Sequence, residues 1–187
     1  MKKNSKRSST TPMRPTAASR AKLPDPYGGT LPMILSGPRA ELRNRTRTRV
    51  PEAHLRRHAE RIMSLIPETR HACVDITLVG ERAIRALNAQ YRGKNKTTDV
   101  LSFRLDDNPG PLEPFGTVVI CARVAAAQAH DEGISLQAML EELILHSILH
   151  LTGSDHETDE DHRAMERRRK NILKKLAAQP PSRQGRA

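Results

Sequence analysis

The segment 136–151 constrains the fold more than any other part of this 187-residue chain. Apolar side chains surround nearly its whole circumference, so a helix formed by it must be buried on most sides. These side chains are Met139, Leu140, Leu143, Ile144, Leu145, Ile148, Leu149 and Leu151. Ser135 is a suitable N-cap and Gly153 a suitable C′ residue, which predicts where the helix begins and ends. The rest of the domain must enclose this helix.

Two histidines interrupt the apolar surface of this helix. His146 and His150 are four residues apart, so they project from one face and can reach one metal ion. A glycine at 153 reverses the chain and lets His156 return to the same point. Three neutral histidines leave one tetrahedral position of a divalent cation open, as in catalytic zinc sites. Imidazoles in an apolar environment need partners, which favours a metal site over ordinary core histidines.

Another histidine pair, His54 and His58, has the same spacing in different surroundings. Arg56 and Arg57 lie between the two, and neither a glycine turn nor a third ligand follows. We interpret this pair as a solvated helix face. His162 falls inside a later helix, and we interpret it as a surface residue.

Apolar periodicity predicts the remaining elements. The expected helices are 52–66, 84–91, 123–132 and a last one from 158 to about 176, and the expected strands are 73–79, 100–103 and 117–121. A segment rich in Pro, Asp and Gly, 106–114, predicts a loop. Helices and strands do not alternate regularly, so we predict an α+β fold. In this zincin-like arrangement, a small mixed β-sheet packs with helices around the central buried helix that carries the metal ligands.

Charge divides the chain into a basic extension and a nearly neutral body. Residues 1–49 contain twelve Lys or Arg and two acids, a net charge of +10 out of +11 for the whole chain. We therefore predict a disordered N-terminal extension over 1–49, a metal-dependent domain over 50–176 and a disordered tail over 177–187. The charge of the extension favours an anionic partner such as RNA. A merely solubilising extension is an equally open interpretation.

No apolar run is long enough to span a bilayer, and the N-terminus lacks the apolar core of a secretory signal. We expect a cytoplasmic protein with no membrane partner, although an acid-poor leader also suits an organellar transit peptide. Cys73 and Cys121 lie in separate strand-like segments, so we interpret them as reduced core residues.

The spacing H-x-x-x-H-x-x-G-x-x-H also occurs in metzincin peptidases. Those enzymes place a glutamate directly after the first histidine as general base, and this chain has Ser147 there. A serine does not accept a proton at neutral pH as a carboxylate does. Glu142, one turn before His146, either approaches the metal or forms a salt link. A zinc peptidase is therefore the weaker enzyme hypothesis.

Two motifs resemble those of one family. The run 146–156, His-Ser-Ile-Leu-His-Leu-Thr-Gly-Ser-Asp-His, resembles the signature of the YbeY family of bacterial metal-dependent endoribonucleases. The segment 87–103, Leu-Asn-Ala-Gln-Tyr-Arg-Gly-Lys-Asn-Lys-Thr-Thr-Asp-Val-Leu-Ser-Phe, resembles the family's other characteristic block. The similarity extends over roughly 50–176. Departures from the family pattern are Ser147, Ser154, Thr97 and Thr117, where glycine, a bulky residue, proline and aspartate are usual.

This resemblance implies a set of site residues. One Zn²⁺ per subunit would be held by His146, His150 and His156, and would lower the pKa of a bound water so that hydroxide reaches a phosphodiester. Arg92 would be the catalytic arginine that grips the scissile phosphate. None of the departures removes a metal ligand, but Thr117 leaves open whether a functional acid is replaced.

Further residues have two interpretations each. Lys94 and Lys96 either contact the RNA backbone or form an exposed basic turn. Asp155 either orients a ligand imidazole from the second shell of the metal or is a turn residue, and Asp99 either serves the cleft or caps a strand turn.

The resemblance finally implies a function. It is a single-strand-specific metallo-endoribonuclease, acting in 16S rRNA 3′-end maturation and late ribosome quality control. Small-subunit ribosomal proteins and an assembly GTPase would be its partners. The alternatives are a non-catalytic zinc-containing ribosome assembly factor and, more weakly, a zinc peptidase. Few aromatic residues are present to stack on bases, so RNA would be held mainly by charge.

Overall fold

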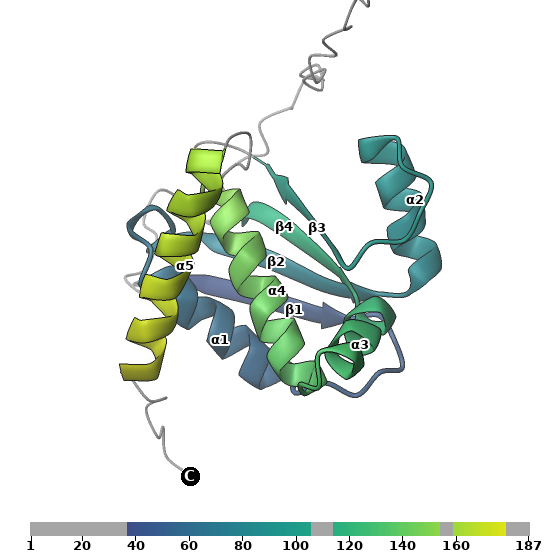
Figure 1. Cartoon of the computed structure of the whole chain (residues 1–187), viewed down its shortest axis with the longest axis horizontal. Helices are drawn as coiled ribbons and strands as arrows, with labels where there is room; N and C mark the ends of the chain where they lie inside the picture. The colour runs from purple at the N-terminus through teal and green to yellow at the C-terminus, as the bar shows by residue number, and fades with distance from the viewer. Residues whose placement is uncertain (1–36, 106–113, 154–158, 179–187) are drawn as a thin grey trace, which may run out of the picture. The chain divides into compact units, whose positions relative to one another are not determined.

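The computed structural model describes residues 37–105, 114–153 and 159–178, which form a four-stranded sheet and the helices packed on it (Figure 1). The strands are β1 (Arg39–Asn44), β2 (Cys73–Val79), β3 (Val100–Arg104) and β4 (Pro114–Cys121). The helices are α1 (Glu52–Ser64), the short 3₁₀ turn η1 (Pro67–Thr69), α2 (Glu81–Arg92), α3 (Ala122–Asp131), α4 (Leu136–Leu151) and α5 (Asp159–Ala178). None of these helices is long and apolar enough to cross a bilayer.

The sheet is mixed, in the order β1-β2-β4-β3. β1, β2 and β4 run parallel, and β3 pairs antiparallel with β4. Both β1 and β3 are therefore edge strands. The α+β fold with a small mixed sheet is confirmed.

Helix α4 occupies the centre of the core. It packs against α1, α3, α5 and the strands β3 and β4, as Figure 1 shows. Leu140 and Ile144 are fully buried, so the predicted central buried helix is confirmed. Its N-terminus is capped as predicted, because the Ser135 hydroxyl accepts a hydrogen bond from the Ala138 N–H at 3.1 Å. Gly153 has a φ of 83°, the left-handed conformation expected of a C′ glycine.

Helix α2 covers the opposite face of the sheet. Ile84 packs there against Leu101 and Val119 in a smaller apolar cluster that also contains Cys121. Cys121 and the half-buried Cys73 are both free, in agreement with the prediction that they form no disulfide.

The predicted disordered extension over 1–49 is wrong for residues 39–44, which form β1. Ala40 is buried and Leu42 half-buried, while the charged residues that alternate with them, Arg39, Glu41 and Arg43, are exposed. Only two apolar residues alternate here, too few for the strand to be recognised among so many arginines. Residues 1–36 and 179–187 lie outside the described residues, and α5 continues through Ala178, two residues into the predicted tail. The predicted loop 106–114 also lies outside them, except for Pro114, which begins β4.

Candidate active site

The two histidines of α4 converge at one point. Both are half-buried, and their Nε2 atoms are 3.0 Å apart, with ring planes at 79° to each other. Two imidazole nitrogens bound to one tetrahedral Zn²⁺ at about 2.0–2.1 Å lie about 3.3 Å apart. His146 and His150 therefore fit a shared cation. Without a cation, the same separation suits an N–H···N hydrogen bond between the rings.

The third predicted ligand, His156, lies outside the described residues, as does Asp155. Within the ranges described, no group of three His, Cys, Asp or Glu side chains forms a metal site. The structure thus brings two of the three predicted ligands together, and the three-histidine site stays a prediction. The N–H of Gly153 donates to the His150 carbonyl at 3.0 Å, so the chain turns directly after the second histidine.

A cleft of about 540 Å³ lies beside the histidine pair, where α4, the edge strand β3 and the end of α2 meet. Its lining consists of Arg92, Thr98, Asp99, Val100, Ser102, Arg104, His146, His150, Leu151 and Gly153. Two arginines and one aspartate are the charged residues of this lining. The cleft therefore combines two potential metal ligands with two guanidinium groups, which suits a substrate that carries a phosphate.

Arg92 is placed by the way α2 ends. Gly93 adopts the left-handed conformation at φ 65°, and its N–H donates to the Ala89 carbonyl at 3.2 Å. The loop beyond is held by the buried Asn88, whose Nδ2 donates to the Lys96 carbonyl at 2.8 Å. All three residues predicted in this segment are exposed, and of these Arg92 lines the cleft whereas Lys94 and Lys96 do not.

Asp99 caps the start of β3, which is one of its two interpretations, and it is also part of the cleft lining. Its Oδ1 accepts hydrogen bonds from the Val100 N–H at 2.8 Å and the Thr98 hydroxyl at 3.0 Å. Its Oδ2 accepts one from Gln128 Nε2 of α3 at 3.2 Å. The carboxylate therefore fixes the start of β3 at the floor of the cleft.

The residues considered for a peptidase lie elsewhere. Glu142 forms a salt link with Arg169 of α5 at 2.6 Å, which is the second of its two interpretations. Ser147 is buried, does not line the cleft, and its Oγ has no hydrogen-bond partner within the part of the chain that the structure describes. Thr117 does not line the cleft either. It pairs with Phe103 of β3 and with Asp75 of β2.

Sequence reasoning missed three polar residues of the lining: Thr98, Ser102 and Arg104. For Ser102 and Arg104, the alternation of residues in β3 could have placed them together. Val100, Ser102 and Arg104 share one face of the strand, and Leu101 and Phe103 share the other. The alternation alone does not show which of these two faces of β3 the helix α4 covers.

The structure corrects the interpretation of His54 and His58 as a solvated helix face only in part. Both belong to α1 and are half-buried, and His54, whose side chain is 44% exposed, has its Nε2 2.6 Å from Glu141 Oε1 of α4. Glu141 lies 87 residues after His54 in the sequence, so the spacing of residues within α1 could not reveal this contact. His162 is exposed on α5, as predicted.

Comparison with known proteins connects this site to a family. A family model described as Endoribonuclease YbeY matches residues 41–177. A protein named endoribonuclease YbeY from Anaeromyxobacter sp. is 44% identical over 101 residues, which are 54% of this chain and 53% of that protein. Its namesake from Alkalilimnicola ehrlichii is 36% identical over 136 residues, which are 71% of this chain and 82% of the relative. This chain therefore spans about half the length of the first relative and most of the second.

Among solved structures, the solution structure of TM1509 from Thermotoga maritima has a TM-score of 0.50 and 25% sequence identity. The match covers 79% of this chain and 99% of that one. The family match runs from within β1 almost to the end of α5 and so includes every element that lines the cleft. The chain belongs to the family of endoribonuclease YbeY.

Proposed function

We propose that this chain is a zinc-dependent endoribonuclease and that the cleft between α4, β3 and α2 is its active site. The observation that carries the proposal is the convergence of His146 and His150 at 3.0 Å in a cleft that also contains Arg92 and Arg104. The names of its relatives support RNA as the substrate.

The histidines would hold one Zn²⁺ through neutral Nε2 atoms, with His156 as the proposed third ligand. Such an ion supplies Lewis acidity toward a phosphodiester and an acidic water for its hydrolysis. The packing of α4 against α1, α3, α5, β3 and β4 holds in place the helix backbone that carries both imidazoles.

The arginines would bind the substrate. A guanidinium donates two parallel hydrogen bonds to phosphate oxygens, and its charge offsets the negative charge that grows during hydrolysis. Arg92 is suited to this role because Gly93 and the Asn88 hydrogen bond fix the backbone around it. Arg104 enters the cleft from β3 and provides a second cation.

The finer function rests on the family resemblance. We propose single-stranded RNA as the substrate and the 3′ end of 16S rRNA as the cleaved segment, in maturation and late ribosome quality control. Small-subunit proteins and an assembly GTPase would bring the enzyme to this RNA.

The test compares wild type, His150→Ala and Arg92→Ala on single-stranded RNA and on a duplex of the same sequence. We expect wild type to cleave the single strand, His150→Ala to lose both zinc and cleavage, and Arg92→Ala to keep zinc but cleave roughly 100- to 1,000-fold more slowly. Arg56→Ala, on the exposed side of α1, is the matched control and should cleave like wild type. Circular dichroism checks folding, and elemental analysis measures zinc.

Equal cleavage by all four proteins would indicate a contaminating nuclease and end the proposal. RNA binding without any cleavage by a zinc-loaded wild type would instead favour the non-catalytic assembly factor.

A further inference from the structure

The segment that leaves β1 toward α1 presents a basic surface outside the cleft. Three arginines at alternate positions are exposed there, while the residues between them are half-buried. We call this segment the arginine loop, defined by Arg45, Arg47 and Arg49. None of the three has an ion-pair partner among the described residues, whereas Arg43, on β1, is paired with Glu41 at 2.7 Å. Three exposed guanidinium groups, with no ion-pair partner in the part of the chain that the structure describes, thus project from one short segment.

The arginine loop is folded by its own polar side chains. Asn44 Oδ1 accepts hydrogen bonds from the Thr46 N–H at 3.0 Å and the Thr46 hydroxyl at 2.7 Å, and Asn44 Nδ2 donates to the Thr48 carbonyl at 2.8 Å. The Arg45 N–H donates to the Leu78 carbonyl of β2 at 2.9 Å. Inward residues therefore hold the backbone while the arginines point out. A loop that is ordered before binding loses less conformational entropy when a ligand arrives.

The arginine loop lies at the same end of the sheet as one end of the cleft, the end at Val100, whereas Arg104 lines the cleft from the opposite end of β3. Asn44 is opposite Leu78, Leu78 is opposite Ile120, and Ile120 is opposite Val100, which lines the cleft. Three spacings between strands, each about 4.8 Å, separate the two ends of this row, or about 14 Å in total. The distance from the arginine loop to Val100, at the near end of the cleft, therefore corresponds to about four stacked nucleotides at about 3.4 Å each.

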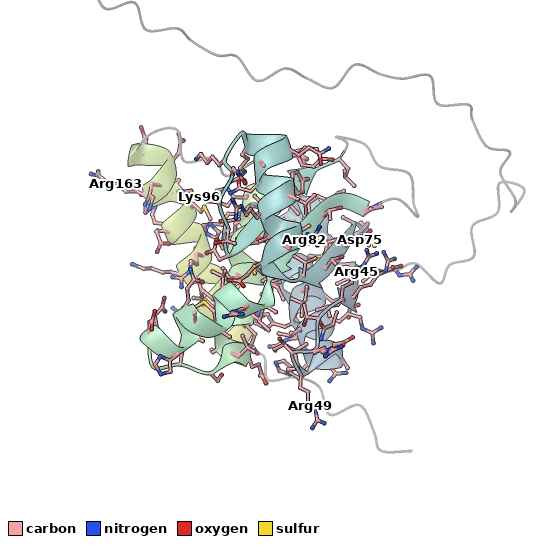
Figure 2. The ribbon with its side chains drawn as sticks, turned by 90° about the vertical axis from the view of Figure 1, so that its right-hand side faces the viewer. Arg45, Arg49, Asp75, Arg82, Lys96 and Arg163 are labelled. Carbon is pink, nitrogen blue, oxygen red and sulfur yellow. The ribbon has the colours of Figure 1, made fainter. Side chains whose placement is uncertain are left out.

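Further basic residues lie at this end of the sheet. Arg82 is exposed in the first turn of α2, directly after β2, and Arg123 is exposed in the first turn of α3, directly after β4. Arg123 lies 3.5 Å from Glu81, so its charge is partly offset. Figure 2, which faces α2, shows Lys96, Arg82 and Arg45 following one another across the view, with the acidic Asp75 beside the last two.

We propose that the arginine loop binds the phosphate backbone of single-stranded RNA that extends from the cleft. This inference rests on the proposed function. Guanidinium groups suit phosphate because they bind it in a bidentate manner. Insertion into a membrane would also need apolar side chains, and none of the exposed large hydrophobic residues of the described part lies in the arginine loop.

The test compares full-length Arg45→Gln/Arg47→Gln/Arg49→Gln with a matched control, Arg56→Gln/Arg57→Gln/Arg70→Gln. All six arginines are exposed, and both variants lose three charges. Fluorescence anisotropy measures Kd as a function of salt concentration for two single-stranded RNAs. Their lengths of about four and about sixteen nucleotides correspond to the smallest and largest sites common in single-strand-binding proteins. Gels check that the RNA stays intact during each measurement.

For the longer RNA, we expect the slope of log K against log salt to become shallower by about 2 in the loop variant, because each phosphate contact contributes about 0.7. The control should keep the wild-type slope. Both variants should bind the shorter RNA like wild type, because it occupies only the cleft.

If the slope of log K against log salt became shallower by the same amount in both variants, the proposal would be overturned, because the loss of total charge would then explain the change. Unchanged RNA binding by the loop variant, with lost binding to phosphatidylserine vesicles, would overturn it in favour of a membrane surface. If wild type bound the longer RNA through the arginine loop but did not cleave RNA, the proposed endoribonuclease activity would be refuted, while RNA binding by the arginine loop would be supported.

Discussion

Tyr91, next to Arg92, is an exposed aromatic residue close to the cleft. The residue is 59% exposed, and its ring meets that of Phe103 edge-on with centroids 4.9 Å apart. An exposed ring beside a bound single strand can stack on a base, which contributes about 1–3 kcal/mol. We predict that Tyr91→Ala weakens binding of single-stranded RNA roughly 5- to 150-fold, as measured by anisotropy. Tyr91→Phe keeps the ring and should bind normally, so an equal loss in both variants would exclude stacking.

Gly116 of β4 lies close beneath the last turn of α4. A Cβ at this position would lie 2.6 Å from Cδ2 of the buried Leu151, the residue after His150. We predict that Gly116→Ala pushes the last turn of α4 outward and lowers the free energy of unfolding by about 1–3 kcal/mol, the usual effect of overpacking. Urea unfolding measures it. Gly37→Ala is the control, because no atom lies within 4 Å of its added Cβ; equal stability of both variants would contradict the prediction.

At the scale of elements, α1 and α4 are joined by a titratable cluster. Glu141 of α4 accepts a hydrogen bond from Gln137 at 2.9 Å and lies 2.6 Å from His54 of α1. Burial opposes the ionisation of Glu141, but the hydrogen bonds from Gln137 and His54 and the charge of His58 prevail and lower its pKa.

The neighbouring His58 has a lowered pKa. Burial is the main cause, and the charges of His54 and Arg61 on α1 add to it, against the attraction of Glu141 and Glu142 on α4. The folded protein therefore holds the His58 proton less tightly than the unfolded chain does.

These shifts predict that acid loosens the α1–α4 contact. The contribution of His58 is fully present above its ordinary pKa of 6.5 and is lost as pH falls below that value, because the unfolded chain then binds more protons. Glu141 acts in the same direction below its ordinary value of 4.5. We expect the free energy of unfolding to fall between pH 7.5 and 5.5 in wild type, and less steeply in His58→Gln. An identical slope in both proteins, measured by urea unfolding with zinc at saturation, would remove His58 as a cause.

At the scale of the whole molecule, the sequence predicts best where local pattern and burial coincide. The bounds of α4 match the prediction of 136–151 because apolar side chains, an N-cap and a C′ glycine all act within the segment itself. β1 escaped prediction because only Ala40 and Leu42 face inward, and its partner β2 lies far along the chain. Arg104 in the cleft and the contact between His54 and Glu141 were also missed, because both depend on which surface α4 covers in the folded protein.

The central position of α4 predicts that a metal ion bound to its two histidines would stabilise the entire domain. Since α4 packs against α1, α3, α5, β3 and β4, its unfolding is not local, and ion binding to His146 and His150 must oppose global unfolding. Zinc at about 100 times its Kd adds about 2.7 kcal/mol, which raises Tm by roughly 5–10 °C. We expect this rise in wild type and in His130→Ala, whose exposed side chain lies on α3, but not in His146→Ala/His150→Ala. Differential scanning calorimetry with and without zinc measures it. A rise of equal size in the double variant would place the stabilising metal elsewhere, and no rise in wild type would contradict a zinc site on α4.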